Sequence, residues 1–307
     1  MVKEKGVSVI ICSRNHKLCE QLIKSMENTI GTDFETIIFD NVEKQWCICK
    51  VYNHCAKKAK YRYLCFIHED VITATRDWGK TMIEFTERTA NCGVIGFAGG
   101  RIAKKNFLDW EYGPKSRYRF YHPEIKKNDK NYNISKLTYK YNNPDNEDFA
   151  KAVTLDGLFL FTSYETWKEN PFDEKMFKGF HFYDADFTFA IAQTKQNYVC
   201  LLADIYHFSG GNRNNEYYED ARVFQKKWKN KLPYAVEGEK ITFNEELNGA
   251  TYYLYNILKE CIRHIIEING NKIIILLLLN IIVKTVKILL RIITGPINSR
   301  RNCQKHK

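Results

Sequence analysis

Three polar residues, His68, Glu69 and Asp70, directly follow an aromatic and apolar run at Tyr63–Ile67. A run of this kind is typical of a strand that is covered on both faces. In an open α/β sheet, ligands bind outside the carboxyl ends of the strands, so these side chains would lie at the binding edge. Carboxylates there suit metal and phosphate chemistry, although a strand that ends in a charged turn would give the same pattern.

Further polar groups follow other apolar segments. Asp40 comes after the run Thr36–Phe39, Asp184 and Asp186 precede a helical pattern, and His207 follows a late apolar run. The three aspartates also have an ordinary structural explanation, because Asp favours turns and can cap the helix that it precedes. A lone His is likewise often a structural residue. The residue types alone therefore leave both the chemical and the structural interpretation open.

The elements that would position these groups alternate between strands and helices. Strands are expected at 6–12, 36–39, 63–67, 93–97 and 198–202, and residues 151–161 are expected to form two strands on either side of a tight turn at Gly157. Helices are expected at 18–26, 51–60, 78–90, 164–170 and 185–192, with a last helix that ends at about 229. Such alternation indicates parallel βαβ units and an α/β sheet.

The segment 101–150 interrupts this alternation. It is rich in Tyr, Lys and Asn and poor in aliphatic residues. A segment of this length without strong periodicity is usually functional or mobile. We therefore expect an excursion over the binding edge of the sheet.

The net charge of +11 is unevenly distributed. Residues 271–307 contain eight Lys or Arg and no Asp or Glu, and residues 101–150 carry a further +4, which leaves −1 for the rest. A nucleic-acid-binding protein needs a basic face on its folded domain, so this distribution argues against a nucleic-acid partner. It favours contact between the basic tail and an anionic membrane surface.

Ten cysteines are scattered along the chain, and none forms a Cys-x-x-Cys pair. The N-terminal residues lack the long apolar core of a signal peptide. A reducing, cytosolic setting is therefore expected. Zinc binding by Cys47, Cys49 and His54 would require an unfavourable spacing.

The C-terminal segment 272–293 consists mostly of Ile, Leu and Val. Its longest apolar run, Ile273–Leu279, is too short to span a bilayer, which needs about 20 residues. The polar positions that share one helix face are Asn280, Lys284, Lys287 and Arg291. This pattern predicts a helix lying in the headgroup plane, with a tilted spanning helix and a dimerisation helix as alternatives.

In the order and placement of these landmarks, the chain resembles a family 2-like, GT-A-fold glycosyltransferase of the bacterial type over roughly residues 6–230. The landmarks are Val7–Arg14, Ile37–Asn41, Phe66–Val71, Leu155–Gly157, Phe180–Phe187 and His207–Gly211. The resemblance implies a Rossmann-like, mixed α/β GT-A domain at 1–232, with 101–150 as its excursion on the acceptor side. A helical linker at 233–270 and a basic, amphipathic, membrane-associating tail at 271–307 would follow.

The resemblance also implies a donor site at the carboxyl ends of the first strands. Ser13 and Arg14 would line the nucleotide pocket, and Asp40 would accept a hydrogen bond from the base. Glu69 is expected to bind the nucleotide sugar. Asp156 and Gly157 would lie beneath a sugar, where glycine permits close approach. Trp110 and Tyr112, in the excursion, could stack on a sugar or serve as packing residues.

A divalent metal, Mn²⁺ or Mg²⁺, is implied where the family has its Asp-x-Asp motif. Asp70 matches the last carboxylate of that motif and would bind the ion that bridges the two phosphates. His68 replaces the first acid, which leaves the affinity and identity of the metal open. His207 matches a late histidine that reaches the metal or the diphosphate in many relatives.

On the acceptor side, Asp184 and Asp186 fall at the motif that supplies the general base. Asp184 is the first choice for the base, and Asp186 could orient the site or share that role. Tyr183 stands where many relatives have Glu, so the motif is only partly kept.

These matches predict a metal-dependent, inverting hexosyl or related transferase acting on a surface or lipid-linked glycan, peripheral on the cytoplasmic face of the cell membrane. A homo-oligomer is left open. The alternative is a non-catalytic glycan- or nucleotide-binding module on a decayed transferase fold, since acids are missing at positions 68 and 183.

Overall fold

A computed structural model of the chain describes residues 3–110, 115–123, 137–209, 213–269 and 280. The chain divides into two compact units, Met1–Glu246 and Leu247–Lys307. The predicted site residues all belong to the first unit, which is a mixed α/β structure. The mixed α/β sheet expected from the sequence is therefore confirmed.

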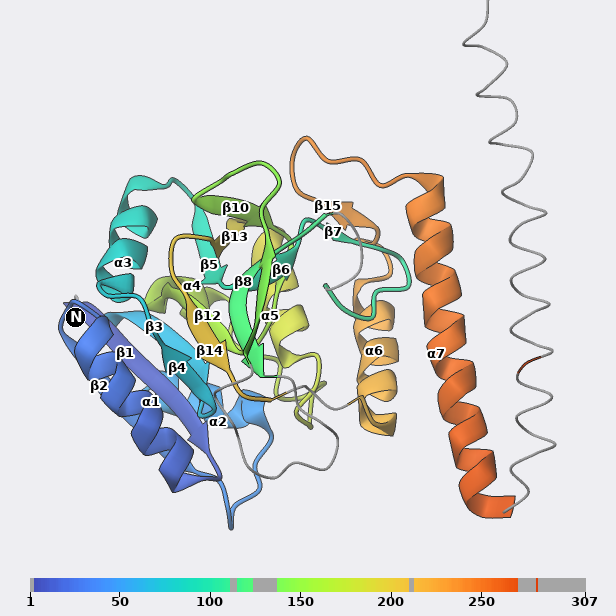
Figure 1. Ribbon diagram of the computed structural model, residues 1–307, viewed down its shortest axis with the longest axis horizontal. Coiled ribbons are helices and arrows are strands. Elements are labelled where there is room, and N and C mark those ends of the chain that lie inside the picture. The colour runs from blue at the N-terminus through green and yellow to red at the C-terminus, as the bar shows by residue number, and fades with distance from the viewer. Residues whose placement is uncertain (1–2, 111–114, 124–136, 210–212, 270–279, 281–307) are drawn as a thin grey trace, which may run out of the picture. The chain divides into compact units, whose positions relative to one another are not determined.

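The main sheet of the first unit has seven strands (Figure 1). In spatial order they are β10 (Phe149–Ala152), β13 (Gln196–Cys200), β5 (Cys92–Gly96), β12 (Phe159–Ser163), β3 (Tyr61–His68), β1 (Glu4–Ser13) and β2 (Phe34–Asp40). The strand β1 lies parallel to β2 and β3, whereas β12 runs antiparallel to β3 and β5. Because β1, β2 and β3 are parallel, their carboxyl ends meet at one edge of the sheet.

A second, smaller sheet packs beside the main one. In spatial order its strands are β11 (Thr154–Leu155), β6 (Ala98–Gly100), β8 (Ser116–Pro123), β14 (Ile205–His207) and β4 (Val71–Thr73), with β9 (Leu137–Asn142) paired to β8. A two-stranded sheet joins β7 (Ile102–Ala103) to β15 (Tyr234–Ala235). The pairing of β14 with β4 places His207 opposite Val71, the residue that follows Asp70.

The helices of the first unit cover both faces of the main sheet. They are α1 (His16–Thr29), α2 (Ile48–Ala56), α3 (Trp78–Arg88), α4 (Tyr164–Glu169), α5 (Tyr183–Ala192) and α6 (Asn215–Trp228). On one face, buried residues of α1 and α3 join a core with the second sheet. On the other, the ring of Phe66 in β3 contacts Tyr52 of α2 and Phe187 of α5. These two apolar layers hold β3 rigidly up to His68.

The segment 101–150, expected as an excursion over the binding edge and without strong periodicity in its sequence, contains strands in its described part. β8 and β9 pair antiparallel. Tyr118 lies opposite Asn142 at one end of the pairing, and Pro123 lies opposite Leu137 at the other. Their pairing extends the second sheet and carries it alongside β14. The excursion therefore helps to build the wall beside His207.

The helix α7 (Phe243–Asn269) crosses from the first unit into the second. Its start is fixed by a capping box, in which Glu245 N donates to Thr242 Oγ1 and Thr242 N donates to Glu245 Oε2. Within the described part of the chain, none of the helices combines the length and the apolar character needed to cross a bilayer. The amphipathic tail predicted at 271–307 lies almost entirely outside the described residues.

Candidate functional site

The loops after the first three strands of the chain converge at the carboxyl edge of the main sheet. Ser13 is paired with Asp40 across β1 and β2, and Cys12 is paired with His68 across β1 and β3. The sequence motifs at the ends of these strands therefore lie next to one another in space. Apolar strand interiors with polar ends are sufficient to produce this arrangement.

Glu69 organises the loop between β1 and α1. Its Oε2 accepts hydrogen bonds from Ser13 Oγ at 2.7 Å, Arg14 N at 3.0 Å and Asn15 N at 2.8 Å. Ser13 is buried, whereas Arg14 is exposed to solvent. The carboxylate of Glu69 thus fixes the loop that carries the exposed Arg14.

Asp40 keeps an exposed carboxylate at the end of β2. Its Oδ1 accepts from Val42 N at 3.0 Å, and its Oδ2 lies 3.5 Å from His16 Nε2. The neighbouring Asn41 is buried, and its side-chain amide binds both the N–H and the carbonyl of Trp46. Asn41 therefore shapes the turn, while Asp40 remains accessible for a ligand.

His68, Asp70 and His207 form a group, here called the His–Asp–His cluster, whose ligand atoms all lie within 4.8 Å of one another. Nε2 of His207 is 3.6 Å from Oδ1 of Asp70, and Phe208 N donates to the Asp70 carbonyl at 3.0 Å. All three residues are half-buried. Two imidazoles and one carboxylate form a donor set that fits a divalent transition metal such as Mn²⁺.

The state of His68 also suits metal coordination. Burial lowers the pKa of its imidazole, and His207 acts in the same direction, whereas Asp70 acts in the opposite one. A metal ligand must be the neutral imidazole, because the protonated ring has no lone pair to offer. The environment therefore favours the form of His68 that can bind an ion.

Tyr183 connects His68 to Gly157. Its hydroxyl lies 2.6 Å from His68 Nε2 and donates to the Gly157 carbonyl at 3.1 Å. A Cβ on Gly157 would overlap that hydroxyl, so only glycine fits here. Phe182, just before Tyr183, has a left-handed backbone with φ +58°, a conformation uncommon for a bulky residue. This left-handed conformation of Phe182 directly precedes Tyr183, whose hydroxyl contacts His68.

Asp184 is held by backbone groups. Its Oδ2 accepts from Gly157 N at 2.8 Å, and its Oδ1 accepts from Ala185 N at 2.8 Å. Burial, followed by the charge of Asp156, raises the pKa of Asp184 to about 7. Among the described residues, no Lys, Arg or His forms an ion pair with it. A carboxyl group with this pKa can both take up and release a proton near neutral pH.

Asp186, the other predicted acid of α5, has a different environment. Its Oδ2 is 2.8 Å from Lys227 Nζ, its Oδ1 accepts from Trp228 Nε1 at 2.8 Å, and it is 3% exposed. Lys227 also contacts Asp173 at 2.8 Å. These bonds tie α5 to α6 and occupy both oxygens of Asp186.

Asp156 follows β11 and is bound on both oxygens. Oδ1 accepts from Leu158 N at 2.9 Å, and Oδ2 accepts from Trp110 Nε1 at 3.0 Å. The half-buried Trp110 is therefore tied to Asp156 and packs against the core. Tyr112, considered with it as a residue that could stack on a sugar, lies outside the described part of the chain.

Phe180 was not selected from the sequence as a site residue. It is 54% exposed, and its ring centroid lies 5.4 Å from that of His68 and 6.0 Å from that of Tyr183. A large exposed aromatic ring beside polar groups is a natural platform for one face of a ligand. Its position inside the Phe180–Phe187 motif was the available signal.

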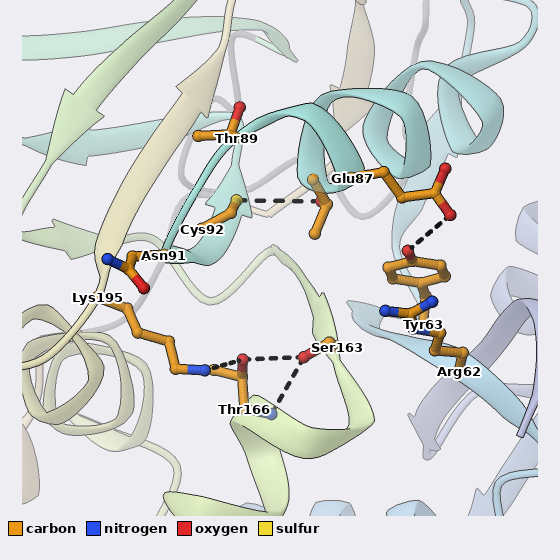
Figure 2. A pocket seen from close by; sticks show the side chains of 10 residues that line it. Arg62, Tyr63, Glu87, Thr89, Asn91, Cys92, Ser163, Thr166 and Lys195 are labelled. Atoms are coloured by element: carbon orange, nitrogen blue, oxygen red, sulfur yellow. Dashed lines mark hydrogen bonds between the residues drawn. The ribbon is translucent and has the colours of Figure 1, made fainter. Parts of the chain in front are cut away.

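A cavity of about 410 Å³ lies at the opposite edge of the sheet, where β3 and β5 begin (Figure 2). Its lining includes Arg62, Tyr63, Glu87, Cys92, Thr166 and Lys195. Glu87 is paired with Lys5 at 2.9 Å, and Lys195 is paired with Glu169 at 3.3 Å. None of the predicted site residues lines this cavity.

Comparisons with known proteins bear on the first unit. The sequence profile of a family described as "Glycosyltransferase like family" matches residues 8–228. No curated protein matches the chain. Among solved structures, A197 from STIV is 15% identical with a TM-score of 0.38, covering 66% of this chain and 85% of that one.

A second solved structure, GalNAc-T7 with UDP, GalNAc and Mn²⁺, is 9% identical with a TM-score of 0.49 and covers 73% of this chain. The match covers 49% of the GalNAc-T7 chain, about half its length.

Proposed function

The chain belongs to the glycosyltransferase-like family, and on that premise we propose that it transfers a sugar from a nucleotide-diphosphate donor to an acceptor hydroxyl. The observation that carries the proposal is the position of the His–Asp–His cluster beside Asp184. Gly157 bonds to Asp184 through its N–H and to Tyr183 through its carbonyl, and Tyr183 contacts His68. The candidate metal ligand His68 and the candidate base Asp184 are thus connected by hydrogen bonds through Tyr183 and Gly157, here called the Tyr183–Gly157 frame.

The residues of the cluster would hold the divalent ion. When bound, such an ion offsets the negative charge of a diphosphate leaving group. Because two of the three ligands are imidazoles, we expect Mn²⁺ to bind more tightly than Mg²⁺, which prefers oxygen ligands. The cofactor is therefore proposed to be Mn²⁺ in preference to Mg²⁺.

The donor is proposed to lie along the ends of β1, β2 and β3. Arg14 is an exposed cation on the loop that Glu69 holds, and it can contact a phosphate. Asp40 offers an exposed carboxylate to the base, and Ser13 supports the loop from beneath. Asp156 and Gly157 would lie beneath the sugar, where Gly157 bonds to Tyr183 and Asp184, and Asp156 bonds to Trp110.

Asp184 is proposed as the general base. It takes the proton of the acceptor hydroxyl while the new bond forms between that oxygen and the anomeric carbon. The bond from the anomeric carbon to the diphosphate breaks, and the nucleoside diphosphate departs with the electron pair. Direct attack of this kind inverts the anomeric carbon. Asp186 takes a structural role in this proposal, because Lys227 and Trp228 occupy its carboxylate.

The proposed acceptor and the proposed membrane location are supported by the sequence alone. We propose a family 2-like, bacterial-type enzyme that acts on a surface or lipid-linked glycan. The basic tail at 271–307 would hold it on the cytoplasmic face of an anionic membrane. Self-association through the apolar face of the tail is a further possibility for the same segment.

A donor screen tests this function. Nucleoside diphosphate release is measured with a panel of nucleotide sugars in Mn²⁺ or Mg²⁺, for the wild type, Asp70→Asn and the control Asp33→Asn. Asp33 is exposed and lies before β2, far along the strand from the cluster. We expect release with at least one donor, faster with Mn²⁺, greatly reduced in Asp70→Asn and unchanged in Asp33→Asn.

Saturable nucleotide binding without release from any donor would contradict the enzymatic proposal. That result would instead support the non-catalytic glycan- or nucleotide-binding module. Equal release by the wild type and Asp70→Asn would remove Asp70 from the proposed metal site.

A further inference from the structure

We propose that Tyr183 is a positioning residue that fixes the tautomer of His68, so that His68 presents Nδ1 to a divalent ion. The inference rests on the metal site of the proposed function, but it concerns a residue outside the ligand set. Tyr183 and His68 are 115 positions apart in the sequence and meet at a hydrogen bond of 2.6 Å.

The direction of that hydrogen bond follows from a count of protons. A tyrosine hydroxyl has one hydrogen to donate, and a carbonyl oxygen can only accept. If the Tyr183 hydroxyl donates to the Gly157 carbonyl, 3.1 Å away, it accepts from His68 and both contacts are hydrogen bonds, whereas donation to His68 Nε2 would leave two oxygen acceptors facing each other. His68 Nε2 therefore carries the proton, and in the neutral ring Nδ1 carries the lone pair that a metal ion binds.

The surroundings hold Tyr183 in this orientation. The side chain is 3% exposed, and its ring lies 5.8 Å from that of Tyr52 and 6.2 Å from that of Phe172. Gly157 has no side chain that would displace the hydroxyl. Because the ring cannot turn without disturbing these contacts, the acceptor position opposite His68 is fixed before any ion arrives.

The same frame links the metal ligand to the proposed base. The N–H of Gly157 donates to Asp184 Oδ2 at 2.8 Å, while its carbonyl accepts from Tyr183. A histidine ligand that donates its second N–H to an oriented partner binds metal more tightly, and loss of such a partner typically costs 10- to 100-fold in affinity. Tyr183 is therefore expected to matter for metal affinity without touching the ion.

The matched pair of variants is Tyr183→Phe and Tyr63→Phe. Both lose one hydroxyl from a buried tyrosine ring, but the Tyr63 hydroxyl contacts Glu87 at 3.3 Å at the other end of β3 (Figure 2). The dissociation constant for Mn²⁺ is measured by titration calorimetry. We expect it to rise at least about 10-fold in Tyr183→Phe and to stay within about 2-fold of wild type in Tyr63→Phe.

A second measurement needs no metal. Nitrogen NMR of metal-free wild-type protein reports which ring nitrogen of His68 is protonated. Protonation at Nε2 in the wild type, with mixed tautomers in Tyr183→Phe, is the expected result. Protonation of His68 at Nδ1 in the wild type would overturn the inference, as would unchanged Mn²⁺ affinity in Tyr183→Phe. If wild-type protein binds no Mn²⁺ but His68 is protonated at Nε2, the proposed metal site fails while the role of Tyr183 in fixing the tautomer stands.

Discussion

The first turn of α5 presents two aspartates to two different regions of the molecule. Asp184 faces the carboxyl edge of the sheet, where backbone N–H groups bind it and burial raises its pKa to about 7. Asp186 faces α6, where Lys227 and Trp228 bind it. Residues of one type, two positions apart, are thus suited to different tasks by the charges and donors around them.

The largest difference between the two should appear in catalysis. Asp184→Asn removes the proposed base without changing the size of the side chain, so turnover should fall by about 10²- to 10⁴-fold. Nucleoside diphosphate release at saturating donor and acceptor measures the effect. Turnover within a few-fold of wild type would show that another group accepts the proton.

Asp186→Asn should act on stability instead. It leaves the buried end of Lys227 with Asp173 as its remaining carboxylate partner, and breaking a buried pair in this way costs about 3 kcal/mol. Urea unfolding measures the change in the free energy of unfolding. Adding Lys227→Met to Asp186→Asn should restore part of the loss, because it removes the buried charge that has lost one of its two carboxylate partners.

That assignment fails if Asp186→Asn unfolds at the wild-type urea concentration and yet loses turnover as severely as Asp184→Asn. Asp186 would then take part in the chemistry, and the contrast between the two aspartates would disappear.

Because the pKa of Asp184 is raised, both stability and turnover should depend on pH in a way that Asp184 determines. The folded state keeps the Asp184 proton up to about pH 7, whereas the unfolded state releases it near its ordinary value of 3.8. The contribution of Asp184 to the free energy of unfolding is therefore greatest at low pH. It falls as pH rises from 3.8 to about 7 and does not change above about pH 7. Turnover should change in the opposite sense and rise through about pH 7, since the base must be ionised.

The difference in unfolding free energy between wild type and Asp184→Asn isolates this group. We expect Asp184→Asn to gain about 2 kcal/mol relative to wild type between pH 5 and pH 8. A difference that does not change with pH would mean that Asp184 titrates at an ordinary pKa.

Phe180→Ala should give the smallest effect on stability. The ring is 54% exposed, so the free energy of unfolding should change by less than about 0.5 kcal/mol. If the ring supports a bound sugar, KM for donor or acceptor should rise by about 3- to 10-fold. Steady-state kinetics with both substrates varied would assign the ring to one of them, and unchanged KM for both would exclude it from the site.

The predictable part of the fold came from strong local patterns. The long apolar strands β1 and β3 and their polar ends were evident in the sequence, and they predicted the α/β class that the structure has. β4 and β14 have three residues each, too few for a period-two pattern to stand out. In β9 (Leu137–Asn142) tyrosines alternate with polar residues, which is typical of a strand. The polar residues around this segment obscured the pattern.

The site could be predicted only in part for a related reason. Strand order was enough to bring His68, Asp70 and His207 together, because each stands at the end of a strand or next to one. Partners supplied by distant helices could not be read from spacing: Lys227 is 41 positions from Asp186. The two departures from the family pattern, His68 and Tyr183, contact each other, which no one-dimensional pattern indicates.

Binding of Mn²⁺ to the His–Asp–His cluster is the most direct test of this account. Electron paramagnetic resonance of free Mn²⁺, titrated with protein, gives the stoichiometry and affinity for wild type, Asp70→Asn, His207→Ala and the control Asp33→Asn. We predict one ion per chain in the wild type and in Asp33→Asn, with affinity at least about 10-fold weaker in the two ligand variants. Wild-type protein that binds no Mn²⁺, or ligand variants that bind it as tightly as wild type, would contradict the central claim.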